Sequence, residues 1–238
     1  RFWPGPLTLV LGLKPDSAIH PLATAGLDTV GIRVPKGFAA ELIRAFGRPL
    51  AAPSANSSGR ISPTTAHHVE ADLGARIDLI VDGGPCPVGV ESTIVKVEDG
   101  RIRLLRPGGV PVEAIEAATG LVVERPKAAG TAAIESPGML ASHYAPDAPV
   151  RLDATSVLPG ETLIRFGSRP IDSLAQAAAV LELSPSGDLG EAAANLFGLL
   201  KRADQTGAAS IAVTPIPDHG LGEAINDRLK RAAAPRTS

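Results

Sequence analysis

Short runs of alternating apolar and polar residues predict a β-sheet in the first half of the chain. Residues 7–11 alternate like a half-buried strand, and residues 29–35 have a strand composition that Pro35 ends. Two further runs, 92–98 and 101–105, are separated by Asp99-Gly100, which is a strong signal for a β-hairpin.

Two apolar runs and three helical patterns complete this first part. Residues 49–53 and 78–82 are short apolar segments that we interpret as buried strands. An apolar residue at every fourth position from Phe38 to Phe46 predicts a helix with one apolar face. The other predicted helices begin at Ser62-Pro63, with serine as the N-cap, and at Pro111; glycines 47, 74 and 120 follow the three helices.

The rest of the chain has a different organisation. Residues 121–149 show no periodicity and are interpreted as a linker, whereas strand and helix patterns alternate from residue 150 onwards. Runs 162–166, 179–183 and 210–214 are predicted strands, and apolar stripes over 189–200 and 221–229 are predicted helices. We therefore predict a small parallel sheet flanked by helices, with domains at 1–121 and 150–238 and a linker at 122–149.

Composition and charge exclude several classes of protein for this chain. The formal net charge is -2, which gives the molecule no general attraction for nucleic acid. The single cysteine, Cys86, excludes a disulfide framework, and no apolar run is long enough to span a membrane or serve as a signal peptide. We therefore expect a cytoplasmic protein. Because the chain starts without Met and directly before a strand, we also expect residues to precede Arg1.

A polar loop after the predicted strand 49–53 is the first candidate for chemistry. Ser54 and Asn56 lie in this loop, and Ser62 lies where the next helix is predicted to begin. Hydroxyls and free backbone N–H groups at a helix N-terminus suit phosphate oxygens. The alternative is that these residues only complete a turn and cap a helix.

Two arginines are candidates for binding an anion. Arg33 interrupts an apolar strand with Thr29 on the same face, and a carboxylate or phosphate is its best bidentate partner; the alternative is a surface arginine on an edge strand. Arg106 precedes Pro107-Gly108-Gly109, where glycine lets the backbone approach a ligand closely. Ser92 brings a hydroxyl to the start of a strand.

Known nucleophile and metal motifs are missing from the chain. It has no Gly-rich loop ending in Lys-Ser/Thr, no Gly-x-Ser-x-Gly and no His-Glu-x-x-His. His143-Tyr144 in the linker is either a small hydrophobic anchor or part of a lid over a pocket.

Seven short segments stand in one order along the chain: Phe2-Trp3-Pro4-Gly5-Pro6-Leu7-Thr8, Val30-Gly31-Ile32-Arg33-Val34-Pro35, Ala52-Pro53-Ser54-Ala55-Asn56, Glu91-Ser92-Thr93-Ile94, Leu105-Arg106-Pro107-Gly108, Ser136-Pro137-Gly138-Met139 and His143-Tyr144-Ala145-Pro146. In this order they resemble the threonylcarbamoyl-AMP synthase family, built on the YrdC-like domain. The resemblance implies a twisted mixed-sheet YrdC-like domain, N-terminally truncated here, and a small Rossmann-like C-terminal α/β domain of the family's longer members.

Members of that family condense L-threonine, bicarbonate and ATP to threonylcarbamoyl-AMP and pyrophosphate, and a partner complex transfers the threonylcarbamoyl group to tRNA. The resemblance implies that no side chain is a nucleophile and that Mg²⁺ accompanies the ATP phosphates. It assigns threonine binding to Arg33, Ala52 and Ser92, and ATP binding to Thr29, Ser54, Asn56, Ser62, Arg106 and Tyr144.

One departure and three alternatives accompany this interpretation. The family's Lys-x-Arg motif and a threonine-binding segment precede the point where this sequence starts, so residues 1–238 alone are expected to be inactive. The alternatives are a double-stranded RNA-binding module, a carbamoyl-adenylate enzyme of hydrogenase maturation and a purely structural α/β protein. A single cysteine disfavours the hydrogenase-related enzyme, and the ordered segments disfavour the structural protein.

Overall fold

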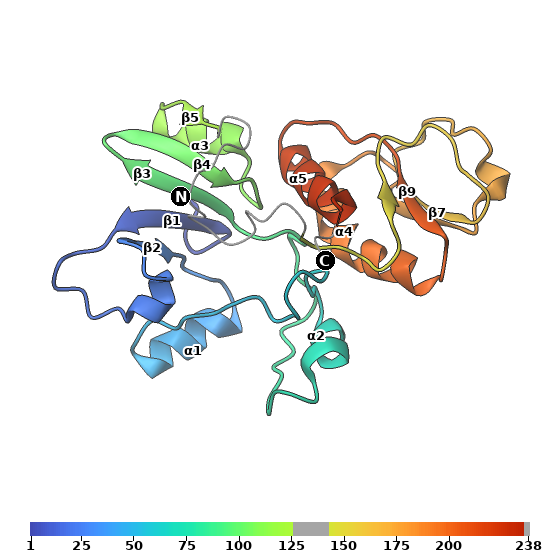
Figure 1. The fold of residues 1–238 in the computed structure, drawn as a ribbon. Helices are drawn as coiled ribbons and strands as arrows, with labels where there is room; N and C mark the ends of the chain where they lie inside the picture. The colour runs from blue at the N-terminus through green and yellow to red at the C-terminus, as the bar shows by residue number, and fades with distance from the viewer. Residues whose placement is uncertain (126–142, 236–238) are drawn as a thin grey trace. The chain divides into compact units, whose positions relative to one another are not determined.

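The computed structural model describes residues 1–125 and 143–235, which form two compact units (Figure 1). The first unit consists of Arg1–Pro53 and Glu91–Leu140, and the second of Ser54–Val90 and Ala141–Ser238. The predicted domain boundaries remain a prediction, and residues 126–142 of the predicted linker lie outside the described residues.

A mixed five-stranded sheet with the strand order β2-β1-β3-β4-β5 organises the first unit (Figure 1). Its central strand β3 pairs parallel with β1 and antiparallel with β4, which confirms the predicted mixed sheet. The strands are β1 (Leu7–Gly12), β2 (Thr29–Ile32), β3 (Thr93–Glu98), β4 (Arg101–Arg106) and β5 (Val123–Glu124). A 3-10 turn, η1 (Pro21–Thr24), precedes β2.

The predicted hairpin between β3 and β4 is confirmed. Asp99 and Gly100 both have positive φ angles, 50° and 73°, which is the conformation that a two-residue hairpin turn needs. Helix α3 (Val112–Thr119) follows and ends at Gly120 in the left-handed conformation, as predicted. Val112 and Ile115 of α3 pack with Leu104 and Val95 in the core of this unit.

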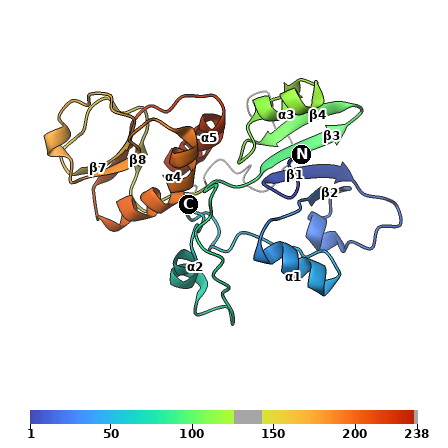
Figure 2. The same cartoon turned by 180° about the vertical axis from the view of Figure 1, so that it is seen from behind.

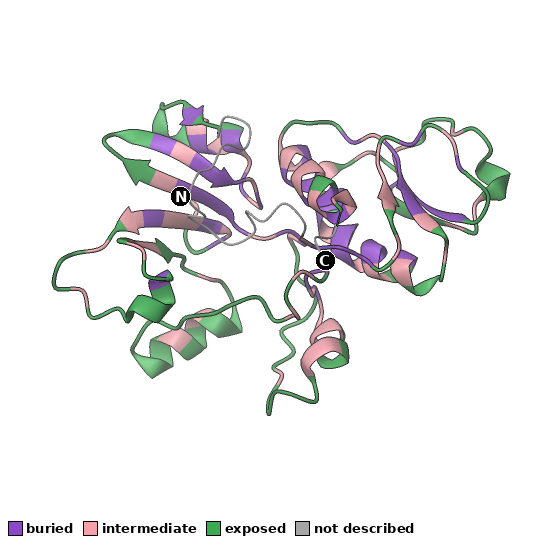
Figure 3. Cartoon of the chain, viewed as in Figure 1, coloured by how far each residue is buried: buried purple, intermediate pink, exposed green. Residues whose placement is uncertain are grey.

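Helix α1 (Phe38–Phe46) forms where its four-residue spacing predicts, and Gly47 ends it with a φ of 72°. None of its residues is buried, however, and Phe38, Leu42 and Phe46 are 51%, 48% and 59% exposed. In Figure 3, α1 is coloured mostly as exposed (green), with some intermediate (pink) residues. The periodicity therefore identifies the helix, but it does not show what the apolar face packs against.

Two predicted strands are wrong. Residues 49–53 and 78–82 adopt no regular secondary structure, and Leu50 and Leu79 are exposed. An apolar run becomes a strand only when a neighbouring strand supplies backbone partners, and neither described sheet includes these segments. The strand predicted for residues 29–35 is shorter than expected, because pairing with β1 ends at Ile32.

The second unit contains the predicted parallel sheet, with the strand order β6-β9-β7-β8 (Figure 2). All three described strand pairs are parallel. The strands are β6 (Val150–Arg151), β7 (Glu161–Phe166), β8 (Ala179–Ser184) and β9 (Ser210–Val213), and the helices are α4 (Leu189–Gln205), α5 (Leu221–Ala233) and the 3-10 turn η2 (Leu174–Gln176).

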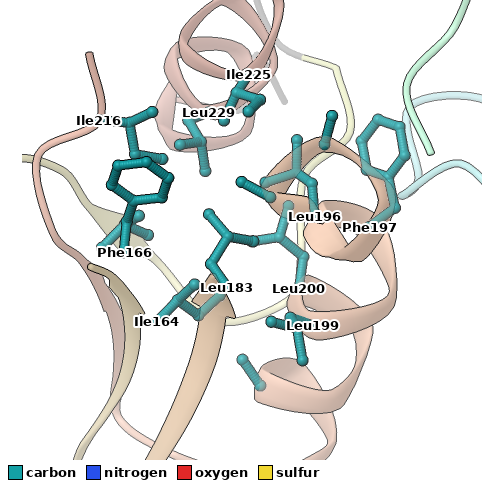
Figure 4. Close-up of a cluster of buried hydrophobic side chains, with 14 of the residues drawn as sticks. Ile164, Phe166, Leu183, Leu196, Phe197, Leu199, Leu200, Ile216, Ile225 and Leu229 are labelled. Carbon is teal, nitrogen blue, oxygen red and sulfur yellow. The ribbon is translucent and has the colours of Figure 1, made fainter. Parts of the chain in front are cut away.

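The core of the second unit is a layer of aliphatic and aromatic side chains between this sheet and helices α4 and α5. Figure 4 shows Leu196 and Leu200 of α4 beside Leu183 of β8, while Ile225 and Leu229 come from α5. These five side chains are at most 2% exposed. Parallel strands buried in this way explain the apolar runs from which the sheet was predicted.

The polypeptide between Ser54 and Val90 packs within the same unit as α4. Ile61 and Val90 belong to its core cluster, and a Cβ on Gly89 would lie only 2.1 Å from the carbonyl oxygen of Ala193. The only helix described in this segment is α2 (Ala66–Leu73). Glycine at position 89 therefore permits backbone contact with α4 that no larger residue could make.

An ion pair between the partly exposed Arg151 and the buried Glu161 anchors the start of β7. Glu161 is 2% exposed, and its carboxylate accepts hydrogen bonds from Arg151 Nη2 at 2.6 Å, Ser210 Oγ at 2.8 Å and the Leu158 backbone N–H at 2.8 Å. The hydrogen bond from Arg151 is the main cause that lowers the pKa of Glu161 to about 2. The ionised carboxylate therefore stabilises the folded unit.

We predict that Glu161→Gln destabilises the protein by about 3 kcal/mol at pH 7, because 2.5 pKa units correspond to roughly that free energy. The folded pKa lies below the ordinary value, so this stabilisation is present above pH 4.5 and is lost as the pH falls towards 2. Denaturant unfolding of parent and variant at pH 7, 4 and 2.5 measures the difference.

The matched control is Glu182→Gln, because Glu182 is 39% exposed and lies 3.6 Å from Arg165 in a looser pair. It should change the unfolding free energy by less than about 1 kcal/mol at every pH. A Glu161→Gln effect that does not shrink in acid would show that charge is not the source of the stabilisation.

Candidate functional site

The predicted residues Ser92 and Arg106 meet at the base of the hairpin in the first unit. The Arg106 guanidinium donates to the Ser92 carbonyl oxygen from Nη2 at 2.9 Å and from Nε at 3.3 Å. The same Nη2 lies 3.3 Å from Ser92 Oγ, which in turn lies 2.8 Å from Thr8 Oγ1. A positive charge and two hydroxyls are thus gathered at the ends of β1, β3 and β4.

Close backbone packing fixes this group. Thr93 Oγ1 donates to the Val110 carbonyl oxygen at 2.6 Å and accepts from the Val110 N–H at 2.9 Å. Between them, the Cβ position of Gly108 lies 2.4 Å from the carbonyl oxygen of Glu91. Only glycine allows the segment after Arg106 to lie this close to the start of β3, so the Pro-Gly-Gly sequence is explained by this contact.

The other predicted site residues of the first unit are more exposed to solvent than Ser92 and Arg106. Thr29 begins β2 and pairs with Gly12, whereas Arg33 lies just after the strand and is exposed. This position corrects the prediction that Arg33 interrupts a strand. Ala52 is exposed in the irregular segment before Pro53. An exposed guanidinium at a strand end can receive a carboxylate without first losing a protein partner.

In the second unit, Ser54 and Asn56 lie in a loop whose shape is set by hydrogen bonds. Asn56 Nδ2 donates to the carbonyl oxygens of Ser57 at 2.8 Å and Arg60 at 3.3 Å. Asn56 Oδ1 is buried and has no hydrogen-bond partner among the residues that the structure describes, while Ser54 is exposed. The loop therefore presents one hydroxyl to the surface and one amide oxygen that a ligand donor could satisfy.

The predicted helix start at Ser62 is wrong. Helix α2 begins four residues later, at Ala66, and Thr65 is its N-cap because its side chain accepts from the His68 N–H at 3.2 Å. Ser62 is instead buried at 7% exposure. Ser62 and the neighbouring threonines all have a hydroxyl that could cap the helix N-terminus. Because Ser62 is buried by packing of the segment, Thr65 is the residue that caps α2.

Tyr144 lies in the core of the second unit and is 1% exposed. Its ring is 5.3 Å from that of Phe197, and the Arg228 guanidinium carbon lies 5.4 Å from the ring centre. This is the hydrophobic anchor that the sequence allowed as one of two interpretations. A contact with nucleotide would require Tyr144 to leave this core, so that role remains a prediction.

Two site residues were missed from the sequence. Thr8 belongs to a recognised segment but was assigned no role, although alternation along β1 places its side chain on the opposite face from Leu7. Asp72, on α2, accepts from the Ser57 N–H at 2.7 Å and from Ser57 Oγ at 2.5 Å. No local pattern connects residues fifteen positions apart, so only the folded chain reveals this contact.

Two further features concern the part of the chain that the structure describes, namely metal binding and membrane-spanning helices. Residues 1–125 and 143–235 contain no group of three His, Cys, Asp or Glu side chains able to hold a metal ion. Among the same residues, no helix combines the length and the apolar character needed to cross a membrane.

Comparison with known proteins assigns the whole chain. Residues 1–108 match a family described as "Telomere recombination", and residues 110–234 match the family "Threonylcarbamoyl-AMP synthase, C-terminal domain". The threonylcarbamoyl-AMP synthase of Bacillus subtilis is 43% identical over 99% of this chain and 72% of the relative. The chain belongs to the threonylcarbamoyl-AMP synthase family.

Other members of this family support the assignment. The Pyrococcus abyssi and Schizosaccharomyces pombe synthases are 40% and 35% identical, over 99% and 98% of this chain and 72% and 65% of the relatives. The crystal structure of P. abyssi Sua5 complexed with L-threonine has a TM-score of 0.83 at 38% identity, covering 98% of this chain and 71% of that one. The predicted family and fold class are confirmed.

A second solved structure concerns an adjacent histidine and tyrosine. It is a P. abyssi Sua5 in which both residues are replaced by alanine, with a TM-score of 0.83 at 36% identity, covering 98% of this chain and 70% of that one. This chain has its own adjacent pair, His143 and Tyr144, whose rings are 4.1 Å apart.

We predict that Gly108→Ala destabilises the first unit by about 2 kcal/mol, because the new methyl group would overlap the backbone of residues 91–93. It should also displace Ser92 from Arg106. Thermal unfolding measures the loss of stability, and a crystal structure of the variant shows the displacement.

Gly12→Ala is the control, because a Cβ there meets nothing within 4 Å and its φ is not positive. It should stay within about 0.5 kcal/mol of the parent. Equal stability of the two variants would contradict the packing role given to Gly108.

Proposed function

We propose that this protein condenses L-threonine, bicarbonate and ATP into threonylcarbamoyl-AMP, with release of pyrophosphate. The observation that carries the proposal is the match of nearly the full chain to synthases of that name, together with the structure of P. abyssi Sua5 in complex with L-threonine.

The chemistry requires binding groups rather than a reactive side chain. The threonine amine forms a C–N bond with bicarbonate as a C–O bond breaks and water leaves, which gives the carbamate. A carbamate oxygen then attacks the α-phosphorus of ATP. That bond forms as the bond from the α-phosphorus to the bridging oxygen breaks, and pyrophosphate leaves with the electron pair. Holding two anionic substrates in line and neutralising their charge supplies most of the catalysis in such a transfer.

We assign the described groups to the two substrates as follows. Arg33, the Ala52 backbone and Ser92 bind threonine, with the Arg33 guanidinium on its carboxylate. By their match to the family's motifs, Thr29, Ser54, Asn56, Ser62 and Arg106 are assigned to ATP, and so is Tyr144 on condition that it leaves the core in which it lies. The Arg106–Ser92–Thr8 group supports this assignment, because it is a cation held beside hydroxyls in a buried setting.

Magnesium and the downstream partner complete the proposal. Mg²⁺ accompanies the ATP phosphates and takes its remaining ligands from water and phosphate oxygens, as is common for this ion. A separate complex consumes the threonylcarbamoyl-adenylate to modify tRNA, which places the reaction in the cytoplasm. The double-stranded RNA-binding alternative is not favoured by the comparisons, and a net charge of -2 gives it no electrostatic support.

We expect pyrophosphate release that requires threonine, bicarbonate and ATP together. The assay is run on the protein as the cell makes it, with each of the three substrates left out in turn. Product formation is followed by mass spectrometry of threonylcarbamoyl-AMP. Release that proceeds without threonine would contradict the proposed function.

Arg33→Ala should weaken threonine binding at least tenfold, because an ionic hydrogen bond to a carboxylate contributes about 1.5–3 kcal/mol. Titration calorimetry with L-threonine measures the affinity. Arg44→Ala, on the exposed helix α1, removes an equal charge from the same unit and should leave the affinity unchanged. Equal threonine affinity in both variants would remove Arg33 from its assigned role.

A further inference from the structure

The loop that carries Ser54 and Asn56 is fastened to helix α2 by a single carboxylate. Asp72 Oδ2 accepts the Ser57 backbone N–H at 2.7 Å, and Asp72 Oδ1 accepts the Ser57 hydroxyl. Both oxygens of one side chain thus hold both polar donors of one loop residue. This residue comes directly after Asn56, so its position determines where Asn56 and Ser54 lie.

Arg76 closes this arrangement into a network. Its Nη2 donates to Ser57 Oγ at 2.8 Å and to the Asp72 backbone carbonyl at 2.9 Å, and lies 3.3 Å from Asp72 Oδ1. The hydrogen bonds from Ser57 are the largest cause that lowers the pKa of Asp72, with a smaller contribution from the charge of Arg76. Asp72 is therefore ionised at neutral pH and accepts charge-assisted hydrogen bonds.

The segment that carries the loop and Asp72 contacts other parts of the second unit at several points. Gly89 packs backbone to backbone on Ala193 of α4, and the charge of Lys201, also on α4, acts on Asp72. At the far end of the loop, Gly59 accepts a hydrogen bond from the Ala145 N–H at 3.1 Å, and Arg60 Nη1 donates to Asp147 at 2.6 Å. The loop is thus tied at both ends within the second unit.

We propose that Asp72 is a positioning residue for the nucleotide, which holds the Ser54–Asn56 loop in its binding geometry through Ser57. It does not contact the substrate. The inference rests on the proposed function, because that function assigns Ser54 and Asn56 to ATP.

Asp72→Ala should raise the KM for ATP about tenfold and leave the KM for threonine within twofold, because the loop loses two charge-assisted hydrogen bonds while Arg33 and Ser92 are untouched. Asp72→Asn keeps one carbonyl acceptor and should recover part of the loss. Pyrophosphate release by the protein as the cell makes it gives both constants, and calorimetry with a non-hydrolysable ATP analogue gives the nucleotide affinity directly.

Glu70→Ala is the matched control, because Glu70 is on the same helix with a side chain 72% exposed and only a 4.0 Å contact to His67. It should behave like the parent. Unchanged ATP affinity in Asp72→Ala would overturn the inference, as would an equal loss of ATP and threonine affinity together with a lower melting temperature, which would mean a purely structural role.

The same experiment separates this inference from the proposed function. If the parent binds ATP and threonine and releases pyrophosphate while Asp72→Ala is unaffected, only the inference fails. If the parent binds neither substrate, the proposed function fails and takes the inference with it. If Ser54→Ala and Asn56→Ala leave ATP affinity unchanged while Asp72→Ala lowers it, the loop assignment is wrong and Asp72 does not act through it.

Discussion

The contact between the start of β3 and the segment after β4 governs the candidate site of the first unit. Gly108 brings two backbones together at a distance that a side chain would prevent, and Thr93 exchanges two hydrogen bonds with Val110 across the same junction. Beside this junction, the Arg106 guanidinium donates to the Ser92 carbonyl oxygen. The site is therefore a consequence of backbone packing, and its charged group is oriented before any substrate arrives.

The second unit uses a different method to hold its polar loop. Ser57, which follows Asn56, donates its backbone N–H and its hydroxyl to the Asp72 carboxylate, and Arg76 donates to the same hydroxyl. Such bonds are individually modest, but an ionised acceptor that takes two donors from one residue restricts that residue strongly. The hydrophobic core around α4 stabilises the folded unit, and the polar network holds the loop residue Ser57 in place.

Features with strong local signals could be predicted from the sequence. The Asp99-Gly100 hairpin, the helices ending at Gly47 and Gly120, and the parallel strands of the second unit each follow from a turn residue or a periodic run, and the structure contains them. The strands predicted at 49–53 and 78–82 failed because strand formation also needs a partner, which is a property of the sheet and not of the run itself.

The site residues also fall into those with a local sequence signal and those without one. Ser92 and Arg106 were identifiable because each stands in a short segment with strong family resemblance, and their contact is confirmed. Asp72 could not be found, since its importance comes from a loop residue fifteen positions away. Thr65 likewise replaces Ser62 as the helix cap, although both have the right chemistry, because burial of Ser62 depends on distant packing.

The kinds of residue in the site agree with a reaction between two substrates. A protein nucleophile needs a neighbouring base to activate it, and its loss abolishes turnover. Here the assigned groups are arginines, hydroxyls and backbone amides, which bind and orient anions and form no bond with them. The rate of such a reaction depends more on where these groups lie than on their intrinsic reactivity. Residues that set those positions, such as Gly108 and the proposed positioning residue Asp72, therefore matter to the site as much as the arginines do.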